Sequence, residues 1–148
     1  MLEKAIEIAV EAHRGQIDKA GKIYILHPIR VMLRGQNEIE QIVGILHDVV
    51  EDTPVTIDML EKEGFSKEIL DALSCITKET GEDYGHFIDR VITNPLATQV
   101  KLYDLEDNMN RDRIPFPTER DEQRFAKYEK YHKVVAAKVT EYRLQGIL

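Results

Sequence analysis

The segment His47-Asp48-Val49-Val50-Glu51-Asp52 gathers four side chains that can bind a metal or carry a proton. It continues an apolar stretch that should be buried, which contains Ile42, Val43, Ile45 and Leu46. Burying an unpaired imidazole or carboxylate costs several kcal/mol unless a cation, a proton or a hydrogen bond compensates. A bound metal ion would supply that compensation, so the segment is a candidate metal site.

Two more polar side chains interrupt apolar sequence and could complete a ligand set. His27 stands in Tyr24-Ile25-Leu26-His27-Pro28, and Asp104 stands in Val100-Lys101-Leu102-Tyr103-Asp104-Leu105. The predicted metal ligands are His27, His47, Asp48 and Asp104. Two imidazoles and two carboxylates without a sulfur ligand suit Mn, Fe(II), Co, Ni or Zn better than Mg or Ca. A six-coordinate ion would keep two positions for water and a phosphate oxygen, and it could lower the pKa of the water from 15.7 toward roughly 7 to 9.

Two acidic residues that follow the His-Asp pair could manage protons. In a continuous helix, His47 and Glu51 share one surface because they are four residues apart, and Asp48 and Asp52 have the same spacing. Glu51 and Asp52 would then lie just outside the metal ligands. There, one could take a proton from water, and the other could orient that water or protonate the leaving group. The pattern predicts metal-assisted hydrolysis with Glu51 and Asp52 as the catalytic pair.

Helical periodicity and helix-start signals account for most of the chain. Starts are marked by a proline or a capping side chain at Pro28, Thr56, Ser66, Pro95 and Thr118. The predicted helices cover residues 2–13, 28–33, 38–50, 57–63, 67–77, 84–93, 95–109 and 119–144, and residues 16–27 and 111–117 are predicted loops. Because no segment shows sustained alternation of apolar and polar residues, the predicted fold class is all-α.

Length and composition are those of an ordinary globular chain. The chain has 148 residues, 43% of them apolar and 32% charged, which suits one domain over residues 1–148. No apolar run approaches the roughly 18 residues needed to span a bilayer, and the first residues lack the basic and apolar regions of a signal peptide. A cytoplasmic protein without membrane contact is therefore expected. The single cysteine, Cys75, excludes an internal disulfide and a thiolate zinc site.

The formal net charge of −7 limits the partners of the chain. It repels polyanions at long range, so nucleic-acid binding is not expected. A small phosphorylated substrate needs only a local cluster of cations or a metal. Cations that could steer phosphate toward the metal, although each can also be read as a surface charge, are Arg30, Lys101, Arg111 and Arg113.

Beyond the separate residues, the order of four segments resembles a known family. The segments are AHRGQIDKAGKIYILHP, GILHDVVEDTPVT, ITKETGEDY and VKLYDLEDNMN, and they span about residues 12–110. They are similar to those of the HD-domain metal-dependent phosphohydrolases, in particular the hydrolase domain of the Rel/Spo alarmone enzymes. The resemblance implies an HD-domain helical bundle with one metal centre. The length leaves no room for the family's synthetase domain, so a stand-alone small alarmone hydrolase is expected.

The resemblance also implies roles for individual residues. The four predicted ligands would bind one Mn(II) ion, and the residues matching Glu51 and Asp52 would serve catalysis. Lys19 and Asn108 would contact the substrate. The implied reaction removes pyrophosphate from the 3′ position of ppGpp or pppGpp and gives GDP or GTP.

Two places in the chain depart from the family pattern. Longer members have an Arg-Lys pair whose arginine packs on the guanine base, where this chain has Asp18-Lys19. An acidic side chain cannot supply that cation contact. Leu105 and Asp107 replace an arginine and a histidine near the last metal ligand. A different substrate, such as another nucleotide or a phosphorylated dinucleotide, is therefore an open alternative.

Hypotheses from other functional classes also stay open. A non-catalytic regulator would bind a nucleotide without turnover, although the Glu51-Asp52 pair argues against a pure sensor. A helical interaction module would hold a structural metal with no exchangeable water. The charged last helix, residues 119–144, could pack on its own domain or on a second subunit of an oligomer.

Overall fold

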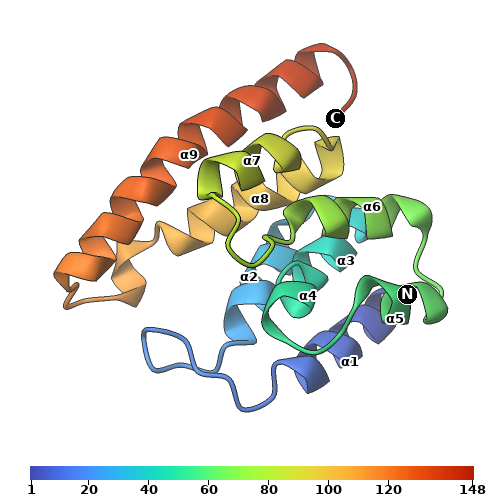
Figure 1. Cartoon of the computed structure of the whole chain (residues 1–148), viewed down its shortest axis with the longest axis horizontal. Helices are drawn as coiled ribbons and strands as arrows, with labels where there is room; N and C mark the ends of the chain where they lie inside the picture. The colour runs from blue at the N-terminus through green and yellow to red at the C-terminus, as the bar shows by residue number, and fades with distance from the viewer.

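The structure is a computed structural model that describes all 148 residues, and its regular elements are all helices (Figure 1). The α-helices are α1 (Leu2–Ala12), α2 (Leu26–Arg34), α3 (Glu38–Leu46), α4 (Val49–Asp52), α5 (Ile57–Lys62), α6 (Lys67–Ile76), α7 (Tyr84–Val91), α8 (Pro95–Asn108) and α9 (Glu119–Leu144), and the 3-10 helix η1 (Arg111–Arg113) joins the last two. A single isolated bridge pairs Ile17 with Ile23. The all-α class predicted from the sequence is confirmed.

Several helices begin where the sequence carries a capping signal. The Thr56 hydroxyl accepts a hydrogen bond from the Met59 N–H ahead of α5, and Ser66 caps α6 in the same way. At α9 the Thr118 hydroxyl accepts from the Asp121 N–H, while the Asp121 carboxylate accepts from the Thr118 N–H. Each bond satisfies a terminal N–H that has no partner inside the helix.

The second helix begins earlier than the sequence predicted. Pro28 is not its first residue, because α2 starts at Leu26. Proline is tolerated throughout the first turn, where the N–H groups have no helical acceptor. His27 therefore lies inside the first turn of α2 and is almost fully buried.

The prediction of one continuous helix over residues 38–50 is wrong. α3 ends before His47, and α4 begins after Asp48, so these two residues form a turn. The His47 Nδ1 donates a 2.7 Å hydrogen bond to the Gly44 carbonyl oxygen. In an unbroken helix that oxygen would accept from the Asp48 N–H. The imidazole thus takes over a helical acceptor at the point where the helix breaks.

The apolar core is centred on α3. This helix packs against α1, α2, α6 and α8, so most of its residues are buried. α8 packs in turn against α2, α3, α6, α7 and α9. The segments that carry the predicted metal ligands therefore meet at one core.

The last helix, α9, runs along α8 on one side of the molecule (Figure 1). Phe125, Val135 and Val139 of α9 are buried, and the Tyr142 hydroxyl donates a hydrogen bond to the Ile92 carbonyl oxygen. α9 thus packs on its own chain, and association with a second subunit stays a prediction. No helix is both long and apolar enough to cross a membrane.

Gly44 allows α2 and α3 to approach closely. A Cβ atom at this position would lie 3.1 Å from the Met32 Cα and 3.4 Å from the Val31 carbonyl carbon. These are backbone atoms, which cannot rotate away. The close approach sets α2, with His27, against the end of α3 that leads to His47.

We expect Gly44→Ala to lower the free energy of unfolding by about 1 to 2 kcal/mol, because overpacking outweighs the helix propensity that alanine adds. Urea unfolding measures the change. In Gly85→Ala, the matched control, the new methyl group meets only the side-chain oxygens of Asp83 and Tyr131. A Gly44→Ala protein as stable as the wild type, or no less stable than Gly85→Ala, would contradict the tight contact.

Candidate metal centre and active-site cleft

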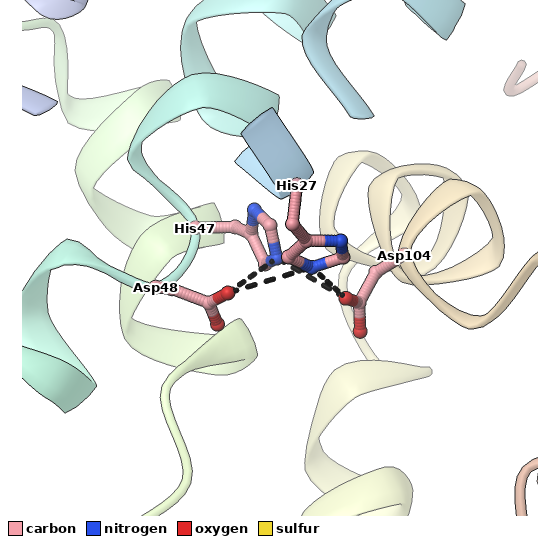
Figure 2. A group of neighbouring side chains, drawn as sticks. All are labelled: His27, His47, Asp48 and Asp104. Atoms are coloured by element: carbon pink, nitrogen blue, oxygen red, sulfur yellow. Dashed lines mark hydrogen bonds and ion pairs between the residues drawn. The ribbon is translucent and has the colours of Figure 1, made fainter. Parts of the chain in front are cut away.

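Three separate segments bring four donor side chains together (Figure 2). His27 comes from α2, His47 and Asp48 come from the turn between α3 and α4, and Asp104 comes from α8. Figure 2 shows the two imidazoles between the two carboxylates, with Asp48 on one side and Asp104 on the other. The structure therefore assembles all four residues that were predicted as metal ligands.

The donor atoms face one another at short range. The Asp104 Oδ1 lies 2.9 Å from the His27 Nε2 and 3.2 Å from the His47 Nε2. The Asp48 Oδ2 lies 3.0 Å from the His47 Nε2 and 3.6 Å from the His27 Nε2. One atom from each side chain lies within 4.8 Å of all the others.

The charges of the cluster favour a cation at its centre. Burial acts to lower the pKa of His47, but Asp48 and Asp104 outweigh it and hold that pKa well above its ordinary value. Burial acts to raise the pKa of Asp104, but Lys101 and the imidazoles hold it well below its ordinary value. The carboxylates are therefore anionic, and their negative charge favours a positive charge beside them, either a proton on an imidazole or a metal cation between the side chains.

These side chains fit a divalent metal ion. Adjacent ligands that each lie about 2.1 Å from one ion are about 3.0 Å apart at 90° and about 3.4 Å apart at the tetrahedral angle. The four contacts between imidazole and carboxylate span 2.9 to 3.6 Å. Nitrogen and oxygen donors without sulfur also suit a first-row divalent ion. The cluster is a candidate site for one such ion.

Asp107 holds His27 from behind, a role that was not predicted from the sequence. Its Oδ2 accepts a 2.6 Å hydrogen bond from the His27 Nδ1, which leaves the Nε2 to face Asp104. Asp107 is buried and also accepts from Arg30 and Arg113. A carboxylate on the second nitrogen of a histidine ligand fixes the ring and raises its basicity. The spacing of Asp104 and Asp107, three residues apart on α8, could have indicated this role.

We expect Asp107→Asn to weaken metal binding by about 10- to 100-fold. Asparagine keeps the shape and one acceptor oxygen, but it loses the charge that orients His27. Calorimetric titration with Mn(II) measures the affinity, and Asp112→Asn in the exposed part of η1 is the matched control. Unchanged affinity in Asp107→Asn, or an equal loss in the control, would contradict this role.

Three further side chains touch the carboxylate ligands. The Tyr24 hydroxyl donates a 2.5 Å hydrogen bond to the Asp48 Oδ2. The Lys101 Nζ donates a 2.8 Å bond to the Asp104 Oδ2, and the Asn108 Nδ2 donates a 3.2 Å bond to the Asp104 Oδ1. These contacts fix the orientation of both carboxylates, and they place Asn108 directly beside the cluster.

A cleft of about 500 Å³ opens over the cluster. The four predicted metal ligands, the Glu51-Asp52 pair and the substrate-contact candidates Lys19 and Asn108 all line it. Burial, and then the neighbouring charges of Arg124 and Lys127 on α9, lower the pKa of Lys19. This wall of the cleft is thus locally cationic, although the chain as a whole is acidic, and it suits an anionic ligand.

Glu51 and Asp52 lie at the end of α4 and form an acidic group with Asp48. Partial removal of water raises the pKa of Glu51, and its Oε1 accepts a 2.8 Å hydrogen bond from the Lys78 N–H. Partial removal of water, and then the charge of Asp48, raise the pKa of Asp52. A carboxylate with a raised pKa is a stronger proton acceptor. Both side chains line the cleft. Their positions were predicted from a continuous helix through His47 and Asp48, and the structure breaks the helix at those two residues.

The remaining candidates for phosphate steering lie in ion pairs. Arg30 and Arg113 both bind Asp107, and Arg111 binds Glu122. Arg113 lines the cleft, whereas Arg30 and Arg111 do not. Of these three arginines, only Arg113 is placed to meet a ligand.

Comparison with known proteins gives several relatives over part of the chain, while no protein-family model matches it. It is 44% identical over 79 residues, 51% of its length, to a Borreliella burgdorferi protein named guanosine-3′,5′-bis(diphosphate) 3′-pyrophosphohydrolase. It is 32% identical over 120 residues, 73% of its length, to a protein of the same name from Aquifex aeolicus. These matches cover 12% and 17% of the two relatives, so the chain spans less than a fifth of their length.

The likeness in fold covers nearly the whole chain. The solved structure of a metazoan ortholog of SpoT, a protein that hydrolyses ppGpp, matches with a TM-score of 0.74 and 22% identity over 99% of this chain and 96% of that chain. At this identity the match shows a shared fold. The chain therefore resembles the Rel/Spo-type ppGpp 3′-pyrophosphohydrolases in sequence, and it has the fold of a metazoan SpoT ortholog.

Proposed function

We propose that this chain removes pyrophosphate from the 3′ position of (p)ppGpp with the help of one divalent metal ion, within a single domain of residues 1–148. The observation that carries the proposal is a cleft containing both the donor cluster and the Glu51-Asp52 pair. The similarity to proteins named ppGpp 3′-pyrophosphohydrolases supports the choice of substrate.

Mn(II) is the proposed ion, because the donor set combines imidazole with carboxylate and the family resemblance implies this metal. Its ligands would be His27, His47, Asp48 and Asp104. When bound, the ion would supply positive charge that stabilises the phosphate oxygens as negative charge develops on them. Asp107 and Tyr24 would hold two of the ligands in orientation through the hydrogen bonds described above.

The side chains at the end of α4 would manage the protons. Glu51, with its raised pKa, accepts a proton from the attacking water. The water oxygen bonds to the phosphorus attached to O3′, and the bond between that phosphorus and O3′ breaks. Asp52, whose pKa is also raised, gives a proton to O3′. The products are GDP or GTP and pyrophosphate.

Lys19 and Asn108 would contact the substrate. Asn108 is hydrogen-bonded to Asp104 and so lies where the reacting phosphate must approach. Lys19 belongs to the cationic wall with Arg124 and Lys127, where the other phosphates of the nucleotide would find positive charge.

Product analysis tests the proposal. Mn(II)-loaded protein should release GDP and pyrophosphate from ppGpp, and a chelator should stop the release. Parallel incubations with nucleotide monophosphates and phosphorylated dinucleotides test the alternative of a different substrate, which stays open because Asp18 replaces the arginine of the longer family members. If one of these compounds releases phosphate in a metal-dependent way while ppGpp stays intact, the proposed substrate is wrong and the proposed metal-assisted hydrolysis stands. Tight ppGpp binding without product would instead identify a nucleotide-binding regulator.

A further inference from the structure

Arg113 is held in the cleft wall by two acidic residues from distant parts of the chain. Its Nη1 donates to the Asp107 Oδ2 at 2.9 Å and to the Asp107 carbonyl oxygen at 3.1 Å. Its Nη2 donates to the Asp18 Oδ2 at 3.3 Å. The side chains of Asp107 and Asp18 are 3% and 8% exposed, so both pairs are shielded from water. The guanidinium is therefore fixed in place between two carboxylates.

The position of the Asp18 carboxylate, which binds Arg113, is fixed by backbone hydrogen bonds within its own loop. The Asp18 Oδ1 accepts hydrogen bonds of 2.9 Å from the Ala20 N–H and from the Lys22 N–H. One oxygen thus shapes the loop between α1 and α2, and the other oxygen binds Arg113. In Figure 1 this loop lies below the corner where η1 leads into α9. The Asp18–Arg113 pair joins the two segments at the cleft.

The flat faces of the Arg113 guanidinium are available to a ligand, while Asp107 and Asp18 engage three of its five N–H donors. A guanidinium whose edge donors are engaged by carboxylates still offers two flat faces for stacking. Arg111 lies 4.4 Å from the centre of the Phe125 ring, but no aromatic ring of the protein lies over Arg113. Ile17 and Ile114 line the same cleft and add apolar surface. A flat heteroaromatic ring matches this setting better than a phosphate, which would compete with two carboxylates for the same donors.

Arg113 lies close enough to the proposed metal centre for one nucleotide to contact both. The Asp107 Oδ2 accepts from the Arg113 Nη1 at 2.9 Å and from the His27 Nδ1 at 2.6 Å, so one carboxylate oxygen separates the guanidinium from a proposed ligand. In a nucleotide, the base and the 3′-phosphate are attached to the same ribose. A nucleotide with its 3′-phosphate at the cluster can therefore carry its base to this part of the cleft.

We propose that Arg113, held by Asp18 and Asp107, is the platform on which the nucleobase of the substrate stacks. The inference rests on the proposed function for the nature of the ligand. It assigns the base to the guanidinium face, and it leaves the phosphates to the metal centre and to the cationic wall.

Binding of the two expected products separates the base from the phosphates. Calorimetry gives the Kd of GDP and of inorganic pyrophosphate for Mn(II)-loaded wild type and Arg113→Lys. Lysine keeps the positive charge between the two carboxylates but has no flat face. We expect the Kd of GDP to rise about 5- to 30-fold, the range expected for loss of a stacked cation, and the Kd of pyrophosphate to stay unchanged. Arg111→Lys, outside the cleft, should change neither value.

Three results would overturn the platform: equal weakening of GDP and pyrophosphate, unchanged GDP binding in Arg113→Lys, or no GDP binding by the wild type. Asp18→Asn is a second variant in case Arg113→Lys does not fold. It can keep the loop-shaping oxygen while it weakens the hold on Arg113, so GDP binding should fall by a smaller factor than in Arg113→Lys. Because GDP binding needs no turnover, a protein that binds GDP through Arg113 but does not hydrolyse ppGpp would refute only the proposed function.

Discussion

Asp48→Ala should remove metal binding and hydrolysis together. The Asp48 Oδ2 lies 3.0 Å from the His47 Nε2, and the same oxygen is fixed by the Tyr24 hydroxyl. Alanine removes a donor atom and one of the two negative charges that attract a cation. A catalytic metal contributes several kcal/mol to transition-state stabilisation, and each 1.36 kcal/mol is tenfold in rate, so we expect a loss of roughly 10³-fold or more.

Calorimetric titration with Mn(II) and the rate of pyrophosphate release measure the two effects of Asp48→Ala separately. The matched control is Asp71→Ala, because Asp71 lies on the surface of α6 and pairs only with Lys67. That variant should keep both metal affinity and rate. Full activity in a metal-depleted Asp48→Ala protein would refute metal-assisted hydrolysis by this cluster.

Helix ends could be predicted from the sequence where a short local signal determines them. The predicted bounds of the last helix, 119–144, agree with α9, and its start is signalled by the capping box of Thr118 and Asp121, which lies within four consecutive residues. The break at His47 and Asp48 could not be predicted in this way. Apolar periodicity continues through it, and the turn depends on the His47 ring and on contacts with α2 and α8.

The meeting of His27, His47, Asp48 and Asp104 was predictable for a different physical reason. A histidine or aspartate inside an apolar segment will be buried, and a buried polar side chain needs a hydrogen-bond or ionic partner. The sequence therefore shows that a partner is needed before it shows which residue supplies it. The identity of the surrounding side chains depends on tertiary packing. Asp107 binds His27 across 80 residues, and Asp18 binds Arg113 across 95. No local pattern joins either pair, so the groups that orient the site emerged only from the fold.

Glu51→Gln should leave metal binding intact and cut turnover by roughly 10²- to 10⁴-fold, the usual contribution of a proton-transfer group. Glutamine keeps the size of the side chain and an oxygen that can accept from the Lys78 N–H. It cannot accept a proton from water. Mn(II) titration and the rate of pyrophosphate release test the two parts, and Glu79→Gln in the exposed loop before α7 is the control.

The pH dependence of Glu51→Gln adds an independent test. A proton acceptor works only when it is ionised, so the wild-type rate should fall as pH drops through the raised pKa of Glu51. The glutamine variant should lose that acidic limb, because the group that produced it no longer titrates. An unchanged rate would move the proton-accepting role to Asp52, whose pKa is also raised. If Glu51→Gln loses metal binding as well as turnover, Glu51 is itself a metal ligand. The substitution can separate proton transfer from metal binding only if Glu51 is not a ligand.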